Sequence, residues 1–165
     1  MNEHARTRSV HQRFWSLPLA LSLAIALCFS AGVAQAETKE GDEILGKWLT
    51  PTGHAVIEIT REGDEYVGSI VWLKDPLDDD GKPVRDVNNS NRRQRDRAIL
   101  GLRLLRGFTF DGNRYVGGRV YDPDNGNDYR GRMSLDDPNT LSLRGYVGIA
   151  AFGRTEIWTR QVEDE

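Results

Sequence analysis

Residues 128–147 read Asp-Tyr-Arg-Gly-Arg-Met-Ser-Leu, then Asp-Asp-Pro-Asn, then Thr-Leu-Ser-Leu-Arg-Gly-Tyr-Val. Two runs of β-type residues are separated here by four residues that favour a turn, because Asp and Asn cap turns with their side chains and Pro fixes φ. A connection this short makes the two strands pair antiparallel. The segment therefore predicts a β-hairpin.

The same alternation of short β-type runs and turn residues continues on both sides of this hairpin. We expect eight strands: Leu45–Thr50, Ala55–Thr60, Tyr66–Leu73, Leu102–Phe110, Arg114–Asp122, Asp128–Leu135, Thr140–Val147 and Phe152–Arg160. Short strands at this spacing indicate a sandwich or a barrel. Closure of the sheet into a barrel removes the two unpaired edge strands of an open sheet. Eight strands enclose space for side chains or one small ligand. We therefore predict an all-β fold, an eight-stranded antiparallel up-and-down barrel, with a two-sheet sandwich as the alternative.

One long interruption, Lys74 to Gly101, separates the third and fourth predicted strands. Its segment 91–97, Asn-Arg-Arg-Gln-Arg-Asp-Arg, predicts one or two helical turns with an Asn cap. Loops this long often lie at the functional end of a domain, although a floppy insertion is an equal alternative.

Arginines are concentrated around this loop. Seven lie between Arg85 and Arg106 against two aspartates, a local charge of +5. This polarity indicates an anion-binding rim for lipid head groups, glycan phosphates or an acidic partner. The alternative is a solvated basic turn that neutralises the nearby acidic stretch Asp78–Asp80. Nucleic acid is not expected, since no aromatic residues are interleaved with the arginines.

The first 36 residues have the pattern of a secretory signal peptide. Arg6, Arg8 and Arg13 precede an apolar run of 13 residues, Leu17–Phe29, and Ala34-Gln35-Ala36 forms a small-residue cleavage site. The run is shorter than the roughly 20 residues of a membrane-spanning helix. We expect cleavage after Ala36 and export to the bacterial periplasm or beyond it, with no integral membrane segment left.

Cleavage would leave 129 of the 165 residues, with 19 basic and 24 acidic side chains and a net charge of −5. We expect a flexible leader at 37–43, one barrel domain at 44–161 and a C-terminal tail at 162–165. Cys28 would be removed and His54 would be the last histidine. A Cys/His zinc site, a thiol enzyme and a disulfide-stapled miniprotein are thereby excluded, and we expect no cofactor.

Catalysis and metal binding find little support in the residue pattern. Nucleophilic triads need a base beside a hydroxyl or thiol, and no Gly-x-Ser-x-Gly elbow is present. The acidic stretch Asp78–Asp80 does not fit a calcium loop, because the spacing puts Pro76 at the first ligand position and Val87 at the last. Ordinary turn chemistry explains this stretch and the second oxygen-rich turn at 122–128. We expect no metal.

Two Arg-x-Tyr pairs, Arg119-Val120-Tyr121 and Arg144-Gly145-Tyr146, are candidates for ligand binding. Strand alternation places each arginine on the same face as its tyrosine. Facing inward, a guanidinium and a phenol could hold a carboxylate. The alternative, which the pattern favours, is that the opposite face with Leu141, Leu143 and Val147 is the core, so that Arg144 and Tyr146 point outward.

Gly46-Lys47-Trp48 on the first predicted strand and Arg160 at the end of the last resemble the lipocalin and wider calycin pattern. In that pattern the tryptophan packs under the arginine at the closed end of the barrel, a cation–π contact of about 1–2 kcal/mol. The resemblance implies that Trp48 and Arg160 form a barrel-closing structural pair.

A more specific resemblance covers nearly all of the chain after the signal. It rests on these runs, in this order: Gly46–Thr50, Ile70–Lys74, Tyr121–Pro123, Arg144–Gly148, Gly153–Thr155 and Trp158–Arg160. Together they resemble a family of small exported bacterial proteins, catalogued as domain of unknown function 2147. The resemblance implies a lipocalin-like barrel in the cell envelope with no assigned activity. The chain departs from the family pattern at Gln94 and Ala98, where we expect leucine and proline.

These observations lead to a hypothesis of an exported envelope protein that binds a small amphipathic or anionic, lipid-like molecule at the open end of its barrel. The candidate ligand-binding residues are Trp72, Arg119, Tyr121, Arg144, Tyr146 and Arg154. One alternative is a non-enzymatic protein whose arginine-rich loop docks an envelope protein or a lipid head group. A further alternative is a carboxylate-dependent hydrolase or isomerase, which would need two converging carboxylates.

Overall fold

The computed structural model describes residues 39–161, so the predicted signal peptide and the C-terminal tail lie outside the described residues. The strands are β1 (Gly46–Leu49), β2 (Ala55–Glu62), β3 (Glu65–Leu73), β4 (Arg103–Phe110), β5 (Tyr115–Val116), β6 (Arg119–Asp122), β7 (Asn127–Asp137), β8 (Thr140–Tyr146) and β9 (Arg154–Arg160). Three short 3₁₀ turns accompany them: η1 (Asp42–Ile44), η2 (Arg92–Gln94) and η3 (Ala150–Phe152).

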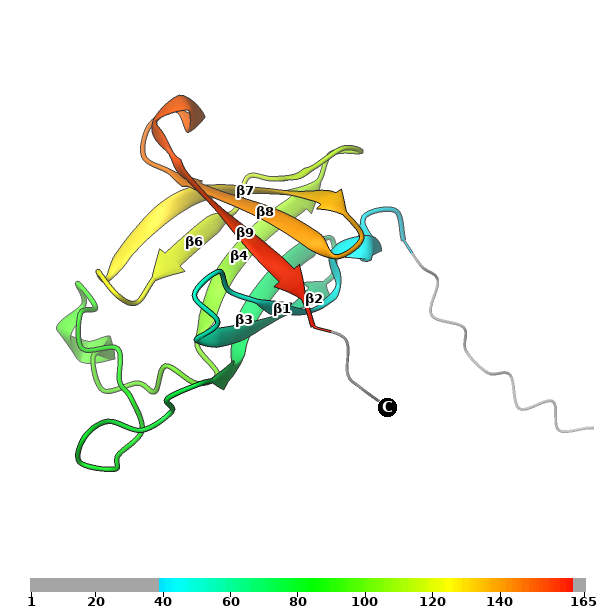
Figure 1. Ribbon diagram of the computed structural model, residues 1–165. Helices are drawn as coiled ribbons and strands as arrows, with labels where there is room; N and C mark the ends of the chain where they lie inside the picture. Colours follow the sequence, from blue (N-terminus) through cyan, green and yellow to red (C-terminus); the bar gives the residue numbers. More distant parts are fainter. Residues whose placement is uncertain (1–38, 162–165) are drawn as a thin grey trace, which may run out of the picture. The chain divides into compact units, whose positions relative to one another are not determined.

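The strands form one antiparallel sheet that closes on itself (Figure 1). Starting from β3, the order is β2, β1, β9, β8, β7, then β5 and β6, then β4, which pairs back onto β3. Because β5 and β6 occupy one position between β4 and β7, the ring has eight members. The predicted eight-stranded up-and-down barrel is confirmed, and the sandwich alternative is wrong.

The predicted strand Arg114–Asp122 is divided in the structure at Gly117 and Gly118. Gly117 adopts a φ of 78°, a left-handed conformation that side chains other than glycine disfavour. A Cβ at Gly118 would lie 2.3 Å from the ring of Phe108. The break therefore gives the Phe108 ring room inside the barrel wall.

The last predicted strand also begins later than expected. Residues 150–152 form η3, and β9 starts at Arg154 rather than Phe152. Val147, expected in the core, is 71% exposed because the chain leaves β8 after Tyr146. The sequence predicts residues 148–151 as the break between the two strands. In the structure this break also takes in Val147 and Phe152, because no neighbouring strand pairs with either of them.

Large side chains fill the barrel interior at the end where β5 and η1 lie. Trp48, Tyr66, Phe108 and Tyr115 are each at most 2% exposed. The rings of Tyr66 and Tyr115 meet edge to face, with centroids 5.0 Å apart and an interplanar angle of 81°. Rings in this arrangement pack favourably and exclude solvent, so this part of the interior is a packed core.

Arg160 closes this end of the barrel over the first strand. Its guanidinium carbon lies 4.2 Å from the centre of the Trp48 ring. The same guanidinium donates to the carbonyl oxygens of Leu45 at 2.7 Å, Glu43 at 2.6 Å and Pro138 at 2.6 Å. Burial lowers the pKa of Arg160 against the opposing effect of Tyr115, and each of its three nitrogens donates to one carbonyl oxygen.

The described part of the predicted flexible leader, from Lys39, binds to this closed end. The Tyr115 hydroxyl donates to the carbonyl of Gly41 at 2.6 Å, and the Tyr66 hydroxyl donates to Asp42 Oδ1 at 3.1 Å. Asp42 also pairs with Arg61 at 2.9 Å. Residues 39–43 are therefore part of the folded domain, because polar side chains of the barrel need partners there. Their polar composition alone does not reveal those partners.

Candidate functional site

The segment between β3 and β4 is built onto the opposite end of the barrel, which we call the loop end (Figure 1). Its two halves pair, with Asp86 N donating to Arg97 O at 3.0 Å and Ile99 N to Val84 O at 2.9 Å. Val84 and Ile99 pack on the barrel core. Asn91 caps η2 by accepting from Arg93 N at 3.1 Å, which confirms the predicted capped turn. The segment is therefore an anchored element, and the interpretation as a floppy insertion is not supported.

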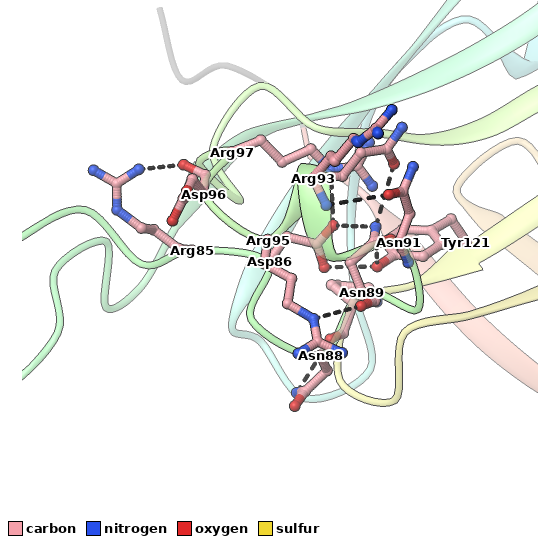
Figure 2. A network of polar contacts seen from close by, with 12 residues as sticks. Arg85, Asp86, Asn88, Asn89, Asn91, Arg93, Arg95, Asp96, Arg97 and Tyr121 are labelled. Carbon is pink, nitrogen blue, oxygen red and sulfur yellow. Dashed lines mark hydrogen bonds and ion pairs between the residues drawn. The ribbon is translucent and has the colours of Figure 1, made fainter.

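Asp86 is the centre of a buried polar network in this segment (Figure 2). It is 0% exposed, and Asn89 is 3% exposed. Asp86 Oδ1 accepts from the Tyr121 hydroxyl at 2.6 Å, while Oδ2 accepts from Asn89 Nδ2 at 2.7 Å and Arg97 Nε at 2.7 Å. Asn89 Nδ2 also donates to the Tyr121 hydroxyl at 2.9 Å. A buried carboxylate normally needs this number of partners.

The network fixes the ionisation of its members. Burial acts to raise the pKa of Asp86, but donation from Tyr121, Asn89 and Arg97 outweighs it, and the pKa of Asp86 lies below its ordinary value. Burial and the Asp86 carboxylate raise the pKa of Tyr121. At neutral pH the pair is thus a carboxylate and a neutral phenol, with the Arg97 guanidinium 5.1 Å over the phenol ring.

We expect acid to loosen this segment. The contribution of Asp86 to stability is complete above 3.8, the ordinary pKa of an aspartate, and is lost as the pH falls through the lower pKa of the folded state. Urea unfolding at pH 6 and at pH 3 measures this loss. In Asp86→Asn the loss between the two pH values should be smaller than in the wild type. Equal losses in both proteins would exclude Asp86 as a source of the acid sensitivity.

An open polar cleft of about 500 Å³ lies beside the network. Its lining includes Asn89, Arg97, Arg103, Arg106, Tyr121 and Asp128. Val120 lies opposite Leu105 in the sheet and shares the space over Gly131 with the buried Phe108 ring, so it points inward. Its neighbour Tyr121, and Arg106 beside Leu105, therefore face the outside of the sheet. The cleft therefore lies between the long segment and the outer wall of the barrel, and Tyr121 is buried because that segment covers it.

Two of the cleft arginines carry surface ion pairs. Arg103 binds both carboxylate oxygens of Glu62, at 2.6 and 3.1 Å, and Arg106 binds Asp128 Oδ1 at 2.6 Å. These four side chains are between 37% and 53% exposed. Exposed ion pairs contribute little to stability, so an entering anion can share or replace them at small cost.

The turn between β6 and β7 closes one side of the cleft. Gly126 adopts a φ of 71°, and a Cβ there would lie 1.8 Å from the carbonyl oxygen of Asn88. The Asn88 side chain in turn donates to the carbonyl of Asp124 at 3.0 Å. Direct backbone contact at Gly126 therefore docks the long segment against this turn.

The sequence pattern of one family, described as an uncharacterized protein conserved in bacteria (DUF2147), matches residues 46–160. The chain belongs to this family. The match confirms the resemblance stated from the sequence and carries no assigned activity.

A solved structure shows the same fold as this DUF2147 member. It is described as protein HP1028 from the human pathogen Helicobacter pylori, which belongs to the lipocalin family. The two chains share 21% identity with a TM-score of 0.62, over 72% of this chain and 83% of the other. At this identity the similarity establishes a lipocalin-like fold. Among the curated proteins compared, none matches the chain.

Tyr121 is the one member of the six predicted ligand-binding residues that lines the cleft of this DUF2147 protein. Arg119 shares its outward face but is exposed, opposite Arg106 on β4 and Arg130 on β7. Trp72 is 45% exposed and pairs with Val56 on β2. The β2–β3 register shifts next to this pair, and the following pair, Ala55 and Leu73, packs against the core.

The other three predicted residues gather around the connection between β8 and β9. Leu141 and Leu143 are in the core, so Arg144 and Tyr146 face outward and the inward alternative is wrong. The side chain of Arg154 is 87% exposed, with a nitrogen 3.9 Å from Glu156. These residues line a surface distinct from the cleft.

Sequence reasoning missed Asp86 and Asn89. Both lie in a stretch of polar residues that reads as a solvated turn. A usable signal was the apolar pair Val84 and Ile99, which brackets the stretch and shows that the segment returns to the core. Across residues 39–161, no helix is long and apolar enough to cross a membrane.

Proposed function

We propose that this protein binds a small anionic molecule in the cleft between the long segment and the outer wall of β4, β6 and β7. The observation that carries the proposal is the juxtaposition of Arg97, Arg103 and Arg106 around one open cleft. Guanidinium groups bind carboxylates and phosphates with charge-assisted hydrogen bonds. In the predicted exported state, this site would face the bacterial cell envelope.

Arg97 supports the proposal because the network holds it in place. Its Nε donates to a carboxylate that is completely buried, and its guanidinium lies over the Tyr121 ring. An arginine that is ordered before the ligand arrives loses less side-chain entropy on binding. Asp86, Asn89 and Tyr121 are therefore positioning residues for Arg97 in this proposal.

A polar ligand fits the site better than a long acyl chain. The cleft is lined mainly by guanidinium, amide and carboxylate groups, and aromatic side chains fill the half of the barrel next to β5. An aliphatic chain bound here would contact polar groups rather than apolar ones, which gives little hydrophobic gain. We therefore narrow the predicted amphipathic or anionic ligand to a small anion with a polar body.

Titration with inorganic phosphate, followed by amide chemical shifts in NMR spectra, tests the proposal. We expect saturable shifts in residues 89–97 and 126–128. Arg103→Gln and Arg106→Gln should each weaken the affinity about tenfold, as expected for loss of one charged hydrogen bond.

Arg92→Gln is the matched control, because Arg92 is exposed on η2 and does not line the cleft. Its affinity for phosphate should equal that of the wild type. Equal weakening by all three substitutions would show nonspecific attraction to the basic segment, and shifts confined to other residues would place the anion elsewhere. Either result would refute the cleft as the binding site.

A further inference from the structure

The connection between β8 and β9 presents apolar side chains to solvent. Its residues 147–152 read Val-Gly-Ile-Ala-Ala-Phe, and we call them the apolar tip. Val147 is 71% exposed, Ile149 61% and Phe152 83%. Single exposed apolar residues are common, but three large ones within six positions mark an interaction surface. The tip is at the loop end of the barrel (Figure 1).

The apolar tip is held in this conformation by polar contacts beneath it. Arg144 donates from Nε to the carbonyl of Ala150 at 2.7 Å and from a terminal nitrogen to that of Ala151 at 3.1 Å. A Cβ at Gly153 would lie 2.5 Å from the carbonyl oxygen of Gly145, so the chain folds back directly onto β8 there. The contacts engage backbone carbonyls and leave the apolar side chains uncovered.

Arginines surround the base of the apolar tip on the outer face of the sheet. Arg119 lies opposite Arg130, and Arg132 lies opposite Arg144 in the β-sheet register. Buried Met133 and Leu143 alternate with them and fix their outward direction. Among the described residues, none of these four arginines has a carboxylate oxygen within 4.0 Å. We call them the arginine face.

The charge of this face contrasts with that of the whole chain, which is −3. Like charges placed directly opposite on neighbouring strands are unfavourable, so an anionic surface over the arginine face would relieve this repulsion. An apolar tip beside clustered cations matches the interfacial region of an anionic bilayer, where apolar side chains enter the acyl boundary and arginines meet phosphates.

We propose that the apolar tip and the arginine face together dock the protein onto an anionic phospholipid bilayer. Val147, Ile149 and Phe152 enter the interface, and Arg130 and Arg132 bind lipid phosphates. None of these residues lines the cleft, although Arg119 lies opposite the cleft residue Arg106. Phe152 and Arg132 are distant from the cleft lining along the sheet, so substitutions there test the docking without altering the proposed anion site. The cleft arginines do not belong to it.

Co-sedimentation with vesicles tests the docking. The protein for this test is residues 37–165, which lack the apolar run at 17–29 that would itself bind lipid. Its described part, residues 39–161, contains the complete closed sheet. We expect binding to vesicles of phosphatidylcholine and phosphatidylglycerol in equal parts. Binding to pure phosphatidylcholine should be at least about tenfold weaker. Added salt at about 0.5 M should reduce binding to the anionic vesicles, because it screens the charges of the arginines.

Substitutions separate the two parts of the surface. Phe152→Ser should lower the partition coefficient about tenfold or more, since a buried phenyl group is lost. Arg130→Gln with Arg132→Gln should lower binding to anionic vesicles and leave the weak binding to neutral ones unchanged. Val87→Ser is the matched control, because Val87 is 61% exposed on the long segment, and it should bind as the wild type does.

Three results would overturn the proposal. The first is the absence of sedimentation with anionic vesicles, and the second is equal binding by Phe152→Ser and the wild type. The third is self-association of the lipid-free protein that Phe152→Ser abolishes while vesicle binding persists, which would assign the apolar tip to a second copy of the chain. Circular dichroism of each variant distinguishes loss of binding from loss of fold.

Discussion

Replacing Asp86 by alanine should release the long segment from the barrel, with a loss of about 2–5 kcal/mol in the free energy that holds it there, the cost of two unsatisfied buried donors. The substitution leaves the Arg97 guanidinium without its buried carboxylate and removes the acceptor of the Tyr121 hydroxyl. The buried Asn89 amide and Tyr121 hydroxyl lose their acceptor, and each buried donor left unsatisfied costs about 1–3 kcal/mol. Arg97 is 36% exposed, so its charge can be hydrated after the substitution. Asp86→Asn should cost less, since an amide oxygen in the place of Oδ2 can still accept the hydrogen bonds from Asn89 and Arg97.

Amide hydrogen exchange in the long segment measures this loss of free energy residue by residue. The amides of Asp86 and Ile99 bond to Arg97 O and Val84 O, and in Asp86→Ala their protection should fall by about a factor of 100 or more. The amide of Leu141 in the barrel wall should keep most of its protection. Asp79→Ala is the matched control, because Asp79 is an exposed aspartate of the same segment. If Asp79→Ala opened the segment as much as Asp86→Ala, the buried network would not be its anchor.

The same substitution links the network to the proposed function. Without Asp86, Arg97 loses the contact that positions it beside the cleft. We expect the affinity for inorganic phosphate to fall in Asp86→Ala even though the negative charge of Asp86 is removed. A purely electrostatic site would bind phosphate more tightly after removal of a nearby carboxylate, so the sign of the change separates positioning from simple charge.

The barrel could be predicted from the sequence because its signals are local. Alternation of apolar and polar residues fixes each strand, and turn residues fix each hairpin, as at 128–147. The pairing of Leu141 and Leu143 with the core follows from the same alternation. The prediction was wrong at Gly117, at Val147 and at Phe152. The reason is a contact that is distant along the chain at Gly117 and a missing neighbour strand at the other two.

The candidate site could not be predicted in the same way. Asp86 and Asn89 are buried against Tyr121, which lies 32 or more positions away along the chain. Their burial therefore depends on a contact between the long segment and the outer face of β6. No local pattern reports which outward face of a sheet will be covered. Tyr121 was selected as half of an Arg-x-Tyr pair, but its partner in the structure is an aspartate of the long segment rather than Arg119.

Trp48→Ala should destabilise the whole domain by about 3–5 kcal/mol, the usual cost of removing a buried tryptophan side chain. Trp48 is 0% exposed, and its indole nitrogen donates to the carbonyl of Ile44 at 2.8 Å. The substitution removes the ring under Arg160 and leaves that carbonyl without its donor. Urea unfolding followed by circular dichroism measures the loss, because the remaining tryptophans make fluorescence harder to interpret.

A double-mutant cycle shows whether Trp48 and Arg160 act together. Arg160→Met keeps an unbranched side chain but removes the cation over the ring and the three hydrogen bonds to the carbonyls of Glu43, Leu45 and Pro138. We expect a coupling energy of about 1–2 kcal/mol between the two sites, the size of a desolvated cation–π contact. Additive effects would mean that Arg160 closes the barrel through its hydrogen bonds alone. Because Trp48 and Arg160 are opposite each other where β1 pairs with β9, a positive coupling would show that their side chains reinforce the backbone pairing between these two strands.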